Sequence, residues 1–290
     1  MLCSQTSFLR WPAPRCGSGP LRQKTAALLP GLLTTVLFCP EDLLVLKAGA
    51  APRRRLIDAA LCQLRPGYAQ TLAEYTRLLE HKQRILKDRF EFPSLLETLP
   101  EFNARMVDTG AQLIAARAAY LRALGVEAAR FHGDFSGGRE TGTLFYETVS
   151  TVTDPFAGLD AIRAQLAEHQ QSHARAELES AQCLSGPHRD DFTVCLGGAP
   201  VKNFGSQGQT RTAAISLKLA ERELSRRDTG EEPVLLLDDV LSELDASRQD
   251  FVLNQIRSGQ VLITCCEQDR FSDLGRRLLV EAGTVRQLGS

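Results

Sequence analysis

Apolar residues recur along the chain at intervals that change from region to region. Val36-Leu37-Phe38 is a short apolar run that predicts a strand, and Pro40–Leu43 follows it as a turn that starts a helix. From Pro52 to about residue 125 the apolar side chains recur every three or four positions, with breaks at Pro93 and Pro100. This spacing predicts an all-helical region of antiparallel helices, the last of them over 102–124.

The period changes from helical to strand-like after a group of glycines that includes Gly137 and Gly138. We expect a strand over 144–149 and a helix over about 158–180. A second strand, 192–196, ends in Gly197-Gly198, a good two-residue hairpin turn.

The last third of the chain alternates helices with short apolar runs. A helix is predicted over about 209–227, and the run Val234–Leu237 is typical of a parallel strand buried on both faces. A helix over about 246–257 and a strand over 261–264 complete a β-α-β unit. The sequence therefore predicts an α/β fold with a parallel sheet and an inserted helical arm.

Charge adds little to this assignment. The chain has 290 residues and a net charge of −1, which by itself points to no nucleic-acid partner. Residues 51–130 carry 13 basic and 9 acidic side chains, whereas residues 131–290 carry 16 and 24. The mild basic excess of the helical region is the usual pattern of a solvated helix surface.

The cysteine spacing argues against a zinc site, and the apolar run near the start argues against a membrane span or a secretory signal. Eight cysteines are present without a C-x-x-C pair or zinc spacing, which favours the reduced thiols of a cytoplasmic protein. The run Ala26–Cys39 is interrupted by Pro30-Gly31 and is too short to span a bilayer, so we interpret its end as a buried strand instead of a signal.

Two acids directly follow the apolar run 234–237. Asp238 is placed at the carboxyl end of a buried strand, where open parallel sheets bind ligands, and a carboxylate there can hold Mg²⁺. Many α/β proteins end a strand with Asp, so Asp238-Asp239 alone leaves a purely structural role open.

The neighbouring segments make the nucleotide interpretation more specific. Asn203–Arg211 is rich in small and amide residues and opens a helix, so its free N–H groups predict an anion site. Leu241-Ser242-Glu243-Leu244-Asp245 follows the acids. A Gly/Ser/Gln turn, a helix, an apolar strand, two acids and Ser-x-x-Asp is the order of the signature motif, Walker B strand and D-loop of ABC-type ATPases.

Five blocks of sequence, from about residue 21 to the end, resemble the RecF family of ABC/SMC-type ATPases in order and spacing. The blocks are Val-Leu-Phe-Cys-Pro-Glu-Asp-Leu (36–43), Arg-Arg-Arg-Leu-Ile-Asp (53–58), Gly-Pro-His-Arg-Asp-Asp (186–191), Phe-Gly-Ser-Gln-Gly-Gln (204–209) and Leu-Leu-Leu-Asp-Asp-Val-Leu-Ser-Glu-Leu-Asp (235–245). The resemblance implies a protein of DNA replication and repair that binds ATP and Mg²⁺ and dimerises around the nucleotide. It also implies action on single-stranded or gapped DNA in recombinational repair and SOS induction, with RecO and RecR as partners.

The resemblance also implies roles for individual residues. Asp238 binds Mg²⁺ as the Walker B acid, and Asp239 orients the attacking water from the position where many ABC enzymes have Glu. The turn residues Ser206, Gly208 and Gln209 contact the γ-phosphate held by the opposite subunit. Both D-loop residues, Ser242 and Asp245, bridge the dimer interface, and Glu41-Asp42 lies near the Q-loop position.

One expected element is absent from the sequence. No G-x-x-x-x-G-K-[ST] string occurs, and Lys24-Thr25 does not replace it because Gln23 stands where Gly is needed and Pro20 removes a donor. In the family this loop precedes every matched block. We therefore expect the amino-terminal P-loop portion to be missing and the chain alone to be unable to hydrolyse ATP.

These assignments predict four segments and leave alternatives open. The segments are a disordered or wrongly assigned leader (1–20), a remnant of the amino-terminal ATPase lobe (21–50), the helical arm (51–130) and the carboxy-terminal ATPase lobe (131–290). The alternatives are a non-catalytic DNA- or partner-binding fragment and a RecN- or SMC-like head. For His188–Asp191, a metal-dependent hydrolase site competes with a surface loop that touches nucleotide or DNA.

Overall fold

The predicted α/β architecture is present in the computed structural model of the chain. The structure describes residues 33–148, 152–256, 258–266 and 275–288, together with a short antiparallel strand pair, β1 (Gly17–Ser18) and β2 (Leu21–Arg22). Apart from β1, the predicted disordered leader 1–20 lies outside the described residues.

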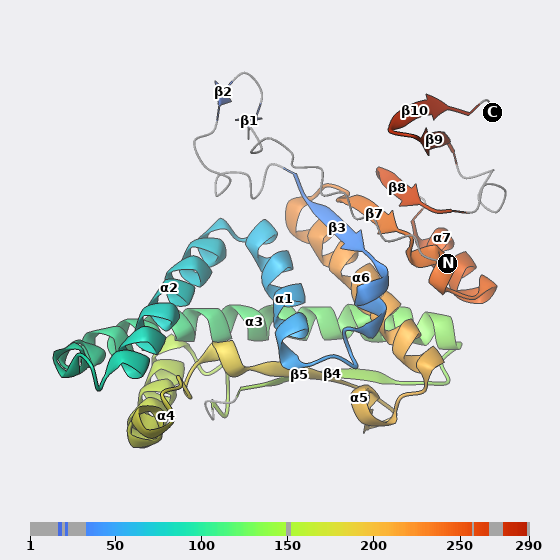
Figure 1. Cartoon of the computed structure of the whole chain (residues 1–290). Coiled ribbons are helices and arrows are strands. Elements are labelled where there is room, and N and C mark those ends of the chain that lie inside the picture. The colour runs from blue at the N-terminus through green and yellow to red at the C-terminus, as the bar shows by residue number, and fades with distance from the viewer. Residues whose placement is uncertain are drawn as a thin grey trace, which may run out of the picture.

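A three-stranded parallel sheet carries the acidic motif (Figure 1). Its order is β3 (Thr35–Phe38), β7 (Val234–Asp238), β8 (Val261–Thr264). All three strands lie where the apolar runs predicted them. In the register of the central strand, Leu237 pairs with Phe38 on one side and Asp238 pairs with Thr264 on the other. The predicted β-α-β unit is confirmed.

Only one face of this sheet is buried. Successive side chains of a strand point to opposite faces, and the inward residues Leu235 and Leu237 are 2% and 1% exposed. On the other face Leu37 and Leu262 are 47% and 48% exposed. Helix α6 (Gln207–Thr229) packs against the first face. The prediction of a strand buried on both faces is wrong for the described residues, which supply no second layer.

A second, antiparallel sheet lies on the other side of the molecule. Its strands are β4 (Gly142–Glu147), β5 (Asp191–Leu196) and β6 (Ala199–Pro200). The predicted hairpin is confirmed, because Gly197 and Gly198 join β5 to β6 with φ angles of 56° and 83° that suit glycine.

The region from Pro52 onward is helical, as its periodicity predicts. The helices are α1 (Ala50–Leu64), α2 (Pro66–Asp88), α3 (Leu99–Ser136) and, after β4, α4 (Leu159–Ser180). Helix α3 runs past the predicted end at Leu124 and continues through Gly125, where it approaches β4: a Cβ there would lie 3.1 Å from that of Leu144. It also passes through the proposed boundary at residue 130, so the division into arm and lobe stays a prediction.

The long helix α3 connects the helical region with the antiparallel sheet and α6. One end packs on α2 and α4, and further along it lies between the antiparallel sheet and α6, as Figure 1 shows. The remaining elements are η2 (Pro40–Leu44), η3 (Pro93–Thr98), η4 (Pro187–Arg189), α5 (Val201–Phe204), η5 (Val240–Glu243), α7 (Ala246–Gln255), β9 (Leu278–Glu281) and β10 (Thr284–Gln287). Among the helices that the structure describes, none is long and apolar enough to cross a membrane.

Candidate functional site

The acidic pair lies at the carboxyl end of β7, where the sequence predicts it. The Asp238 side chain is exposed, and its Oδ1 accepts a hydrogen bond of 2.7 Å from the Thr264 hydroxyl. The Asp239 backbone N–H donates to that hydroxyl over 2.9 Å. Thr264 therefore holds both acids from the next strand, and Asp239 takes a left-handed conformation with φ of 50°.

The two acids fit a magnesium ion in part. Carboxylate oxygens are preferred Mg²⁺ ligands, and the ion usually takes one or two of them together with waters and substrate phosphates. The Asp239 Oδ1 atom is buried and has no hydrogen-bond partner among the described residues. Among the described residues as a whole, no group of three or more His, Cys, Asp or Glu side chains could hold a metal ion. The acids thus suit a metal that arrives with nucleotide.

The predicted signature turn forms the start of α6. Ser206 is its N-cap residue: the Ser206 Oγ accepts from the Gln209 backbone N–H over 3.2 Å, and the Gln209 Oε1 accepts from the Ser206 N–H over 2.9 Å. Gly205 is required before this capping box, because a Cβ there would lie 2.7 Å from the Val201 carbonyl oxygen. Ser206 is exposed, so the N-terminal end of α6 reaches the surface at this residue.

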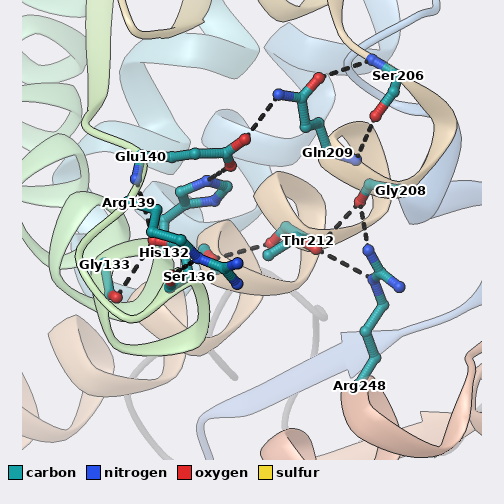
Figure 2. A network of polar contacts seen from close by, with 11 residues as sticks. His132, Gly133, Ser136, Arg139, Glu140, Ser206, Gly208, Gln209, Thr212 and Arg248 are labelled. Atoms are coloured by element: carbon teal, nitrogen blue, oxygen red, sulfur yellow. Dashed lines mark hydrogen bonds and ion pairs between the residues drawn. The ribbon is translucent and has the colours of Figure 1, made fainter.

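A buried histidine and a glutamate support this turn (Figure 2). The Gln209 Nε2 donates to Glu140 over 2.7 Å, and the other carboxylate oxygen of Glu140 lies 2.8 Å from the His132 Nε2. The hydrogen bond from Gln209 is the main cause that lowers the pKa of Glu140, and the contact with His132 adds to it. Glu140 lies between α3 and β4, 69 positions before Gln209.

Two arginines join the signature helix to the D-loop region. Arg248 on α7 donates over 3.0 Å to the Gly208 carbonyl and over 3.0 Å to the Thr212 hydroxyl, as Figure 2 shows. Its guanidinium also pairs with Asp245. Arg211 on α6 lies 3.4 Å from a Glu243 carboxylate oxygen. These side chains connect the signature turn to the D-loop within the chain.

Both predicted D-loop residues make local contacts. The Ser242 hydroxyl donates to the Asp239 carbonyl over 2.6 Å, so the D-loop folds back on the acidic pair. Asp245 is the N-cap of α7 and accepts from the Arg248 N–H over 3.0 Å. That hydrogen bond, aided by the Arg248 guanidinium, lowers the pKa of Asp245 against the opposing effect of burial. Both side chains are exposed.

The structure brings together some predicted residues and separates others. The signature residues Ser206, Gly208 and Gln209 are linked through Arg248 to Asp245, and Ser242 is linked to Asp239. Within the described parts of the chain, no hydrogen bond or ion pair joins the signature turn directly to Asp238 or Asp239.

Side chains of helices α1 and α2 hold the segment His188–Asp191 in place. Burial lowers the pKa of His188 to about 4, and its Nδ1 lies 2.7 Å from the Tyr75 hydroxyl. Arg117 donates over 2.7 Å to the Pro187 carbonyl beside it. These contacts favour a structural role. In the pair Glu41-Asp42, Asp42 is used locally, since it accepts from the Cys39 N–H at the start of η2.

Sequence reasoning missed four residues of this site: His132, Glu140, Arg248 and Thr264. Arg248 carried a usable signal, because it stands three positions after an Asp that caps a helix. Thr264 also carried one, because it ends the strand next to the acids. His132 and Glu140 reach the site through the tertiary fold alone, and no spacing in the sequence marks them.

The comparisons with curated proteins and with solved structures point to one family. No protein-family model matches the chain. The chain is 38% identical over 272 residues to the DNA replication and repair protein RecF of Symbiobacterium thermophilum, covering 91% of itself and 72% of that protein. It is 39% identical over 248 residues to RecF of Agathobacter rectalis, covering 86% of itself and 66% of that protein.

This chain belongs to the RecF family. A solved structure of the recombination mediator protein RecF with ATP superimposes with a TM-score of 0.83 at 31% identity, covering 92% of this chain and 71% of that one. A second, described as RecF-ATPrS in the RecFOR pathway, gives 0.86 at 30% identity with the same coverage. The predicted ABC-ATPase-like head is confirmed. The RecF-family chain spans about two thirds of the length of the curated relatives.

Proposed function

We propose that this RecF-family chain acts in DNA replication and repair as the signature-bearing part of an ATP-dependent dimer. Asp238 binds the Mg²⁺ of the nucleotide, and Asp239 orients the attacking water. The turn at Ser206, Gly208 and Gln209 contacts the γ-phosphate of ATP that the opposite subunit holds. Single-stranded or gapped DNA is the substrate in recombinational repair and SOS induction, RecO and RecR are the partners, and the compartment is the cytoplasm.

The observation that carries the proposal is the outward-facing start of α6. Ser206 is exposed, and next to this turn Phe204 is 73% exposed, a large apolar surface that a second subunit would cover. The helix dipole favours an anion at this place, although the Gln209 N–H of the first turn is already bonded to the Ser206 hydroxyl. Because Asp238 and Asp239 are not bonded to this turn, a nucleotide-binding site is best completed by residues from two subunits. Ser242 and Asp245, both exposed, would lie at the same interface.

The chemistry of hydrolysis is divided between the subunits. Asp238 would hold Mg²⁺, which would neutralise charge on the phosphate oxygens, and donors at Ser206 and the turn would stabilise the transferring group. The phosphate cradle and its Lys must come from a P-loop, for which this sequence has no string. Each missing charge-assisted contact is worth about 1.5–3 kcal/mol, so the 290-residue chain alone should neither bind ATP tightly nor hydrolyse it.

A complementation assay tests this division. A RecF protein that contains a P-loop is first inactivated at the serine that aligns with Ser206. Adding the present chain should restore Mg²⁺-dependent ATP hydrolysis, and its Ser206→Arg form should not. Turnover by the isolated chain that disappears in Asp238→Asn would overturn the proposal, because another loop would then cradle the phosphate.

A specific observation favours a second function, a non-catalytic DNA- or partner-binding module. A cleft of about 890 Å³ opens where the arm meets the lobe, with Arg54, Lys87 and Arg189 in its wall. Arg54 and Arg189 donate to backbone carbonyls, and neither forms an ion pair within the described residues. Gapped-DNA binding that is lost in Arg54→Ala/Arg189→Ala, without any complementation of ATPase activity, would favour this alternative.

A further inference from the structure

The contacts around Glu140 determine which way the side-chain amide of Gln209 points. An ionised carboxylate only accepts hydrogen bonds, so Glu140 must face the NH₂ end of the amide. That orientation leaves the Gln209 Oε1 toward the Ser206 N–H, as the 2.9 Å distance shows. If Glu140 were replaced by an apolar residue, the amide could rotate by 180° and the capping box would lose its acceptor.

Glu140 is itself fixed by the carboxyl end of α3. The His132 side chain, only 3% exposed, contacts its carboxylate over 2.8 Å, and the Ser136 hydroxyl accepts from the Glu140 N–H over 3.3 Å. His132 contributes only one ring nitrogen to a bond, because its buried Nδ1 has no partner in the described structure. The neighbouring cation Arg139 adds a weaker favourable charge. Figure 2 shows this chain of contacts leading from α3 to the signature turn.

We propose that Glu140, held by His132, is a positioning residue that sets the geometry of the signature turn from the arm helix α3. The inference rests on the proposed role of this turn in contacting a nucleotide phosphate. Helix α3 extends from Leu99 in the arm to Ser136 beside Glu140. A shift of α3 along its axis would therefore displace His132 and Glu140 first, and the Gln209 amide with them. The arm and the ATP-binding turn are coupled through two side chains.

A spectroscopic measurement tests the positioning without nucleotide. In the ¹⁵N-labelled full chain, the side-chain amide signal of Gln209 is assigned by its loss in Gln209→Glu. It should move with pH only below the ordinary carboxyl pKa of 4.5, where Glu140 becomes protonated. Glu140→Gln and Glu140→Ala should both abolish this movement, and His132→Gln should bring it closer to pH 4.5. The amide of Gln83, which donates over 2.6 Å to the Ala181 carbonyl, is the matched control and should not follow Glu140.

Kinetics of the complemented ATPase test the consequence. Glu140→Ala should lower kcat about tenfold, the effect of one lost charge-assisted hydrogen bond, and leave KM for ATP within about twofold because the partner subunit's P-loop holds the nucleotide. Glu140→Gln, which keeps the size and an acceptor, should retain activity within about threefold of the unchanged chain.

The two measurements separate the inference from the proposed function. An unchanged Gln209 signal or an unchanged kcat in Glu140→Ala overturns the positioning role and leaves the proposed ATPase function standing. If the unaltered chain restores no ATPase activity while Gln209 still reports the protonation of Glu140, the proposed function fails. In that outcome Glu140 still orients the turn, and the inference holds for its geometry only.

Discussion

The Arg53 guanidinium and the Asp191 carboxylate meet through two hydrogen bonds of 2.6 Å each. This bidentate pair joins α1 to the start of β5, segments 138 positions apart. Arg53 is 3% exposed at its side chain and donates again, over 2.7 Å, to the Ala48 carbonyl. Two of the sequence blocks that resemble RecF, 53–58 and 186–191, therefore meet at the base of the predicted arm. The pair attaches the predicted arm to the predicted lobe.

Removing one partner of this pair should destabilise the fold strongly. Arg53→Ala leaves the carboxylate and several carbonyls without their donor, and we expect the free energy of unfolding to fall by about 3–5 kcal/mol. Urea denaturation followed by circular dichroism measures it. Arg105→Ala is the control, because Arg105 and Glu74 form an exposed pair at 2.7 Å whose loss should cost no more than about 1 kcal/mol. Equal effects of the two substitutions would contradict the assigned role.

The low pKa of His188 should make stability depend on pH. Burial lowers that pKa from 6.5 to about 4, so the unfolded chain takes up a proton first as the pH falls. The contribution of His188 to stability therefore falls between pH 6.5 and 4, by at most about 3 kcal/mol, and does not change further below pH 4. His188→Gln should flatten this part of the profile. His81→Gln, at an exposed position of α2, should keep the slope of the unchanged chain. If the slope persists in His188→Gln, the pH dependence comes from another group.

The uncovered face of the parallel sheet should promote self-association. Leu37 and Leu262 lie on the same face of the sheet, in the two strands that flank β7, and are about half exposed. We expect the purified chain to aggregate and Leu37→Lys/Leu262→Lys to reduce light scattering without lowering the melting temperature. Phe90→Ser serves as the control, since Phe90 is 83% exposed but lies in the arm. A monodisperse unchanged chain would show that this face is covered in solution.

The sequence predicted the parts of the fold whose signal is local. The apolar run before Asp238 and the glycine pair after β5 each determine their own conformation, so the strand and the hairpin were predicted correctly. The end of α3 was not: the helix continues through Gly125, whose missing side chain lets Leu144 pack closely. Local propensity gave way to tertiary packing at this position.

Only part of the candidate site could likewise be predicted from the sequence. Its acids and signature turn are contiguous motifs and could be found from residue order alone. Glu140 and His132 could not, because they touch Gln209 only after α3 and α6 have packed together. Whether both faces of the parallel sheet are buried could not be inferred either. An apolar strand can be covered on both faces, but the residues that cover it must come from another segment or chain.

The last prediction concerns Arg248, which links the signature turn to the D-loop. Arg248→Ala removes the donors to the Gly208 carbonyl and the Thr212 hydroxyl together with the pair to Asp245, and should cost about 1–3 kcal/mol. Amide hydrogen exchange should then accelerate in both the first turn of α6 and the first turn of α7, because each loses the same anchor. Arg226→Ala is the matched control: Arg226 pairs with Glu223 within α6 and should leave both turns unchanged. Faster exchange in α7 alone would mean that the two motifs are held independently, and Arg248 would then be only a local partner of Asp245.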